Sequence, residues 1–135
     1  MSTNIEHLLG LSKAASPLAF LEQVNAGLSI DALHRVARQI SPADSAFVYQ
    51  LIPKSTLARR QSKLNADEST KLARVAKVWK MALAVWGTAA EARAFLSRPH
   101  QLLEGQRPID VVLASEFGSP LVEGILGRLQ YGSAA

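Results

Sequence analysis

The 135-residue sequence predicts an all-α protein, on the basis of three observations. No segment alternates apolar and polar residues with the period of two that a half-buried strand requires. Apolar residues instead recur at spacings of three and four, and capping residues, prolines and glycines separate the segments that show this spacing. The length allows one domain or two very small helical ones. A content of 48% hydrophobic and 19% charged residues is typical of a folded chain.

The first two predicted helices begin at serine caps. Residues 1–16 are mostly small or polar and predict no element. Ser16-Pro17 places an N-cap serine before a proline at the first helical position, and the helix that follows is expected to end at Gly27. Ser29 is expected to cap a second helix that reaches Ile40.

Residues 41–61 predict a helix-turn-helix. Ser41-Pro42 repeats the cap-and-proline signal, and Pro53 breaks that helix and begins a short one through about Arg60. In such a unit small hydroxyls contact phosphate and arginines reach base edges, guanine above all, in the major groove. A plain helical hairpin explains the pattern equally well. The candidate DNA contacts are Lys54, Ser55, Thr56, Arg59, Arg60 and Lys63.

The positive charge is concentrated in the middle of the chain. Residues 54–80 hold eight basic and two acidic residues, a balance of +6, whereas the rest holds seven basic and nine acidic residues, a balance of −2. Phosphate backbones attract such a concentration. Charge alone slightly favours the alternative, a solvated helix face.

The longest predicted helix spans about residues 66–86 and joins an N-terminal part, 1–64, to a C-terminal part, 65–135. Its apolar residues step by three and one, so they share one face, opposite a row of cations. The apolar face comprises Leu72, Val75, Ala76, Trp79, Ala82, Leu83 and Trp86, and the cations are Lys71, Arg74, Lys77 and Lys80. Val78, Met81 and Val85 lie on a flank and are candidates for a dimer contact. Burial against the first two helices is an equally supported alternative.

Three further helices are expected after Gly87, which is a natural C-cap. Thr88, with Glu91 three residues later, predicts a capping box. After a turn at 102–105, Pro108 is expected to start a helix that runs through Phe117. The last helix is expected from Ser119-Pro120 to about residue 131, with Leu121, Val122, Ile125, Leu126 and Leu129 on its apolar face.

The string FLSRPHQLLEGQRPIDVVLASEFGSPLVEGILGRLQYG, residues 95–132, resembles the toxin-binding domain of the Xre/MbcA/ParS antitoxins, which are partners of RES-domain toxins. The matching elements are Phe95-Leu96, Pro99, Leu103 to Gly105, Arg107-Pro108-Ile109-Asp110, Leu113, Gly118, Val122-Glu123 and Leu126 to Gly132. A looser similarity extends upstream to about residue 45. Glu104-Gly105 stands where family members commonly have two glycines, and Ser133-Ala134-Ala135 replaces a bulkier apolar and aromatic ending.

The resemblance implies an antitoxin that neutralises an NAD-degrading RES toxin and represses its own operon through an Xre/Cro-like helix-turn-helix. Its expected partners are the toxin, operator DNA and a second copy, because such proteins usually read two half-sites as dimers. We expect residues 128–133 to block the nucleotide pocket of the toxin. The candidate toxin contacts are Leu126, Arg128, Gln130, Tyr131, Gly132 and Ser133. Without the resemblance, a frayed tail would be the preferred interpretation.

The remaining patterns argue against an enzyme. No nucleophile elbow, phosphate-binding glycine loop or carboxylate pair occurs, and His7, His34 and His100 lack the spacing of metal ligands. We therefore expect no catalytic residues, metal or cofactor. The absence of cysteine, of an apolar run of about 18 residues and of a basic N-terminal region indicates a cytoplasmic protein without a membrane span. The alternative function is a stand-alone helix-turn-helix regulator without a toxin partner.

Overall fold

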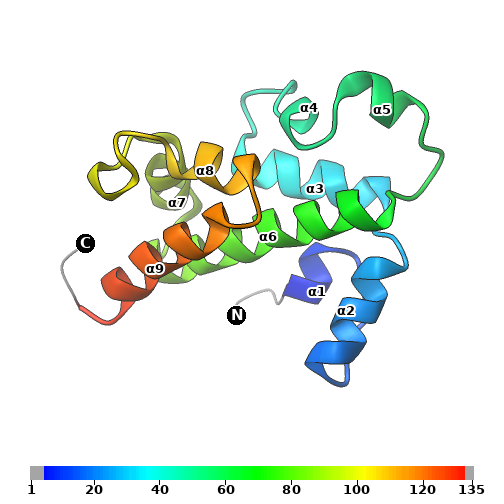
Figure 1. The fold of residues 1–135 in the computed structure, drawn as a ribbon, viewed down its shortest axis with the longest axis horizontal. Coiled ribbons are helices and arrows are strands. Elements are labelled where there is room, and N and C mark those ends of the chain that lie inside the picture. Colours follow the sequence, from blue (N-terminus) through cyan, green and yellow to red (C-terminus); the bar gives the residue numbers. More distant parts are fainter. Residues whose placement is uncertain (1–4, 133–135) are drawn as a thin grey trace. The chain divides into compact units, whose positions relative to one another are not determined.

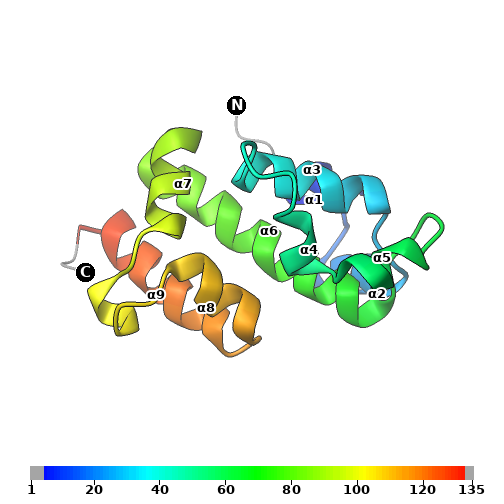
Figure 2. The same cartoon turned by 90° about the horizontal axis from the view of Figure 1, so that it is seen from above.

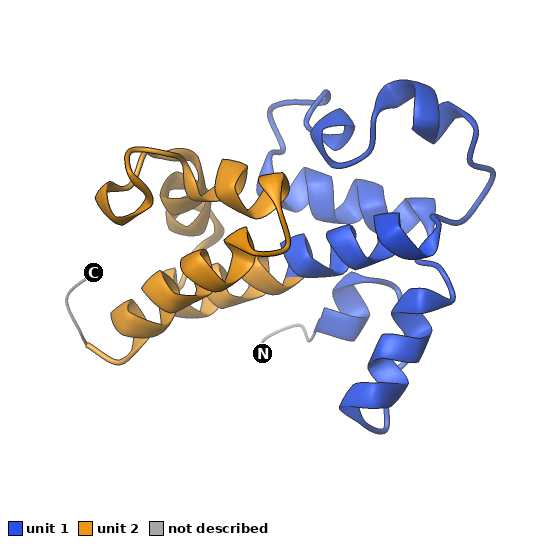
Figure 3. Ribbon diagram, in the orientation of Figure 1, with its two compact units in different colours: residues 1–76 blue, residues 77–135 orange. Residues whose placement is uncertain are grey.

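The computed structural model describes residues 5–132, which form helices and no strands, so the predicted all-α class is confirmed (Figure 1). The chain divides into two compact units, residues 1–76 and 77–135 (Figure 3). The division falls inside the long helix α6 (Ala66–Trp86). The domain division expected from the sequence, after residue 64, stays a prediction. No helix in the described part of the chain is long and apolar enough to cross a membrane.

The described part of the first unit, residues 5–76, contains five helices and the beginning of α6. They are α1 (Ile5–Leu8), α2 (Pro17–Asn25), α3 (Ile30–Ile40), α4 (Val48–Leu51) and α5 (Lys54–Ala58). The serine caps form as expected: Ser16 Oγ accepts a hydrogen bond from Ala19 N at 3.1 Å, and Ser29 Oγ accepts one from Ala32 N at 3.0 Å. Each bond satisfies an amide that the first helical turn leaves without a backbone partner.

Helix α1 is an element that the sequence analysis missed. Leu8 and the following Leu9 are buried, and the Leu8 carbonyl accepts a bond from Arg35 Nη1 at 3.0 Å. The spacing of Ile5, Leu8 and Leu9 is the helical signal that could have indicated it.

The helix expected directly after Ser41-Pro42 does not form. Residues 42–47 are mostly turns, and α4 begins only at Val48. Asp44 Oδ1 accepts a bond from Ala46 N at 2.9 Å, so the aspartate offers the backbone a local alternative to the helical ladder.

Within residues 77–132, the second unit contains the end of α6 and four further elements, α7 (Ala89–Ser97), the 3₁₀ turn η1 (Gln101–Leu103), α8 (Pro108–Ala114) and α9 (Gly118–Gln130). Thr88 Oγ1 accepts a bond from Glu91 N at 3.2 Å, as a cap should. Helices α8 and α9 pack side by side, which Figures 1 and 2 both show. A Cβ atom at Gly118 would collide with the carbonyl oxygen of Val111, so only glycine permits this approach.

The boundaries of α8 and α9 differ from the prediction. Helix α8 ends at Ala114 rather than at Phe117, because Ser115 is extended and its Oγ accepts a bond from Phe117 N at 3.0 Å. Helix α9 then starts one residue before Ser119, whose side chain is buried.

Candidate functional site

The candidate DNA contacts lie on and after α5, which follows α4 across a break at Ile52-Pro53. Lys54, Ser55, Arg59 and Lys63 are exposed, and Thr56 is half-buried. Lys54 Nζ stands 5.6 Å from the centre of the Tyr49 ring, a cation–π contact that holds the ammonium group beside α4. The short helix therefore presents cations and hydroxyls to solvent together, as binding to a phosphate backbone requires.

Arg60 differs from its neighbour Arg59 because it is bonded within the chain. Its Nε and Nη2 donate to the two carboxylate oxygens of Glu68 at 2.9 and 2.8 Å, and its side chain is 27% exposed. The hydrogen bond from Arg60 is the main reason that the pKa of the Glu68 carboxyl lies below its usual value. The backbone hydrogen bond from Asn65 and the positive charges of Arg60 and Arg59 lower this pKa further, against the effect of burial. Glu68 Oε1 also accepts a bond from Asn65 N, and Glu68 N donates to Asn65 Oδ1. The arginine therefore anchors the end of α5 to the capping box that begins α6.

The cations along α6 make more contacts within the protein than side chains of a fully solvated row would make. Lys71 Nζ donates to the Gln50 carbonyl at 3.4 Å, and its pKa is lowered by burial and by nearby Arg74. In the second unit, Lys77 pairs with Glu123 at 3.2 Å, and burial lowers the pKa of Lys80.

The candidate toxin contacts divide into buried and exposed residues. Leu126, which was expected to contact the toxin, is 0% exposed: it belongs to the core and offers no surface to a partner in this structure. Arg128, Gln130 and Gly132 are exposed, and Tyr131 is 83% exposed. Gly132 has a φ of +80°, the left-handed conformation in which a helix can end. Ser133 lies outside the described residues.

One side of α9 is exposed and apolar, and the residues of the expected apolar face divide between this side and the core, since Leu121 is exposed whereas Val122, Ile125 and Leu126 are buried. Leu121 is 59% exposed and Phe117, which precedes the helix, is 78% exposed. At Gly124 no atom lies within 4 Å of where a Cβ would be, so the backbone is open to close approach. Spacings of three and four put these residues on one side of the helix. We call this the outer face of α9, formed by Phe117, Leu121, Gly124, Arg128 and Tyr131.

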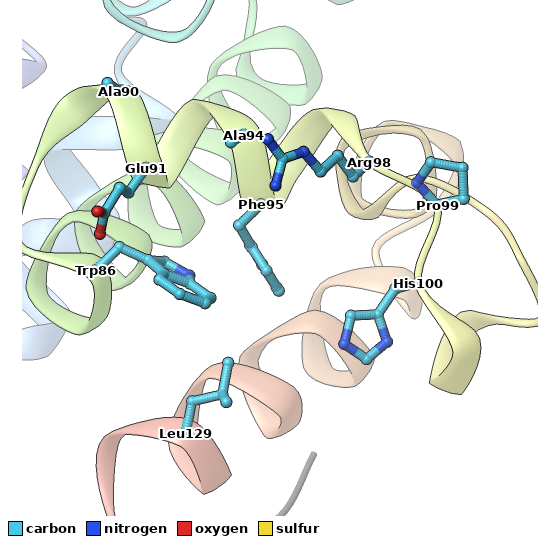
Figure 4. Close-up of a pocket in the computed structure, with 9 residues that line it drawn as sticks. All are labelled: Trp86, Ala90, Glu91, Ala94, Phe95, Arg98, Pro99, His100 and Leu129. Carbon is cyan, nitrogen blue, oxygen red and sulfur yellow. The ribbon is translucent and has the colours of Figure 1, made fainter.

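The second unit also contains a pocket of about 750 Å³ that the sequence analysis did not identify (Figure 4). It is lined by Trp86 from α6, Phe95 from α7, His100 from the turn before η1, and Leu129 from α9. The Phe95 ring centre is 5.8 Å from that of Trp86 and 6.0 Å from that of His100. Three aromatic residues near the ends of predicted elements were the available signal, but only the fold brings them together.

Other expected features are placed as follows. Val78 is buried at 1% exposed, so it offers no surface to a second copy, whereas Met81 and Val85 are half-buried. Within residues 5–132 no group of three or more acidic or histidine side chains could hold a metal ion. Arg107 and Asp110 of the Arg-Pro-Ile-Asp motif bond to each other with two contacts of 2.8 Å, which stabilises the start of α8.

Comparisons with known proteins match both units. Residues 19–77 match a family described as the antitoxin Xre-like helix-turn-helix domain, and residues 81–132 match one described as the antitoxin Xre/MbcA/ParS C-terminal toxin-binding domain. A curated relative, antitoxin Xre of Pseudomonas putida strain KT2440, is 29% identical over 133 residues. That alignment covers 95% of this chain and 81% of the relative.

Proposed function

Because this chain belongs to the Xre/MbcA/ParS antitoxins, we propose that it neutralises a RES-domain, NAD-degrading toxin and represses its own operon. The observation that carries the proposal is that the two family matches cover almost all of the chain from residue 19 to 132, one for each activity. An operator and its repressor share the cytoplasm, where we place the protein. The proposed role is stoichiometric binding rather than catalysis.

Neutralisation is proposed to occur by occlusion of the toxin's nucleotide pocket. Tyr131 supports this because a large, rigid and amphipathic side chain that is 83% exposed fits an interface anchor better than a folding contact. It follows the last turn of α9, and Gly132 carries no side chain that would widen the segment. The outer face of α9 would extend the contact along the helix.

DNA binding is proposed to use Lys54, Ser55, Thr56, Arg59 and Lys63. We assign Arg60 a positioning role, because its guanidinium is already bonded to both oxygens of Glu68. Arg59, which is exposed beside that fixed point, is the proposed base or phosphate contact. A homodimer would place two such helices on two half-sites, with Met81 and Val85 as the remaining candidates for its contact.

The occlusion mechanism can be tested by deleting residues 131–135. The purified full-length protein should inhibit NAD hydrolysis by the toxin of its operon, whereas the truncated protein should not. Circular dichroism of the truncated protein is the control for its folding, because the deletion lies in the second unit and operator binding is assigned to the first. If the truncated protein inhibits as well as the full chain, the occlusion mechanism is refuted. If even the full-length protein forms no complex with the toxin, the antitoxin function itself is refuted.

A further inference from the structure

The aromatic pocket of the second unit has the size and lining of a binding site. Its volume of about 750 Å³ lies within the usual range for pockets that enclose a ligand, roughly 300–1,000 Å³. Trp86, Phe95, His100 and Leu129 supply its apolar wall (Figure 4). Arg98 is exposed at its border. Flat apolar groups suit such a wall because aromatic rings gain contact area and favourable edge or stacked geometry.

Packing rather than hydrogen bonding holds the Trp86 ring. Its Nε1 is enclosed and has no acceptor among the described residues, and the indole is only partly buried. By contrast, His100 is fixed, because its Nδ1 accepts a bond from Leu102 N at 3.1 Å. The two sides of the pocket are therefore held differently, the Trp86 side by packing and the His100 side by a hydrogen bond.

The location of the pocket indicates which partner would occupy it. Every lining residue lies between Trp86 and Leu129, inside the segment that matches a toxin-binding domain. Leu129 is two residues before Tyr131, so the pocket lies at the same end of α9 as the segment that we propose enters the toxin. The tail Ser133-Ala134-Ala135 has side chains far too small to fill the cavity.

We propose that this pocket receives a large apolar side chain of the toxin, in addition to the contact made by Tyr131. This inference rests on the proposed function, since it needs a toxin partner. The two proteins would then hold each other reciprocally, with the antitoxin's C-terminal segment in the toxin and a toxin side chain between α7 and α9. Reciprocal insertion gives one buried anchor on each side, the arrangement in which interface energy concentrates.

The first test fills the pocket. Ala94 lines it, so Ala94→Phe should lower toxin affinity at least tenfold, which is about 1.4 kcal/mol. Ala114→Phe is the matched control, because Ala114 is exposed at the end of α8 and does not line the pocket. It should change affinity less than twofold. Equal affinities for the two variants, both folded by circular dichroism, would overturn the proposal.

The second test leaves the pocket residues unchanged. Full-length antitoxin labelled with 5-fluorotryptophan has two ¹⁹F resonances, one from Trp86 and one from Trp79, which is 1% exposed. Unlabelled toxin should shift the Trp86 resonance and leave that of Trp79 in place. A complex that forms with the Trp86 resonance unmoved overturns the pocket proposal and leaves the antitoxin function intact. If no complex forms, both fail.

Other occupants of the pocket predict other results, in the ¹⁹F spectra or in native mass spectrometry, and each would overturn the proposal. A second copy would shift the Trp86 resonance as the free antitoxin is concentrated. If the chain's own tail occupied the pocket, deleting residues 131–135 would shift the Trp86 resonance in the absence of toxin. A retained small molecule would appear as added mass in native mass spectrometry of the purified protein.

Discussion

Alanine substitutions at Leu126 and Tyr131 should separate folding from toxin binding. Leu126 lies on α9 and Tyr131 follows its end five residues later, yet Leu126 is 0% exposed and Tyr131 is 83% exposed. Truncating a fully buried leucine removes its transfer free energy and leaves a cavity, so Leu126→Ala should lower the free energy of unfolding by about 3 kcal/mol. Tyr131→Ala should change it by less than about 0.5 kcal/mol.

The effect on toxin affinity should have the opposite order: among folded variants, Tyr131→Ala should weaken toxin binding more than Leu126→Ala does. If Tyr131 is an interface anchor, its loss should cost about 2 kcal/mol of binding free energy, or roughly a 30-fold weaker complex. Urea unfolding followed by circular dichroism measures the first quantity, and inhibition of the toxin's NAD hydrolysis at increasing antitoxin concentration measures the second. Equal destabilisation by both substitutions would refute the reasoning, because it would give Tyr131 a packing role that its exposure does not allow.

Three further predictions concern the rest of the chain. Arg59→Ala should weaken operator binding in fluorescence anisotropy at least tenfold with an unchanged melting temperature, whereas Arg60→Ala should lower the melting temperature; the reverse result would exchange their roles. Glu104→Gly should raise the free energy of unfolding by about 0.5–1 kcal/mol in urea, because Glu104 has a φ of +55°, which glycine adopts without strain; a loss of stability would contradict this. The pKa of Glu68 is lowered in the folded state, so its contribution to stability is present above the unfolded pKa of about 4.5 and is lost as the pH falls through the lower folded pKa. Acid titration of Glu68→Gln, monitored by circular dichroism, should therefore lose less stability over that range than the unchanged protein.

Local signals in the sequence were sufficient for most of the helices. The caps at Ser16, Ser29 and Thr88 act within three residues, so their hydrogen bonds could be predicted without knowledge of the fold. The same local reasoning failed at Ser41-Pro42, because Asp44 offers a competing turn that the cap-and-proline signal does not exclude.

The candidate site depended more on contacts distant in sequence. Helix α9 is apolar on more than one side, so periodicity could not distinguish the buried Leu126 from the exposed Leu121. Only the positions of the other helices decide which leucine is covered. The ion pair of Arg60 could not be predicted for the same reason, because its partner Glu68 lies eight residues away across a loop.

The glycine at the start of α9 also fixes where the tyrosine after its end is presented. Backbone contact with α8 sets the register at Gly118, and thirteen residues at about 1.5 Å each place Tyr131 roughly 20 Å farther along the axis. One inserted residue between them would rotate the aromatic ring by about 100° around the helix and remove it from the row that contains Phe117 and Leu121. If Tyr131 and this row contact the toxin as proposed, the length of the helix sets their relative positions, and natural variants should conserve it more strictly than they conserve the individual side chains along it.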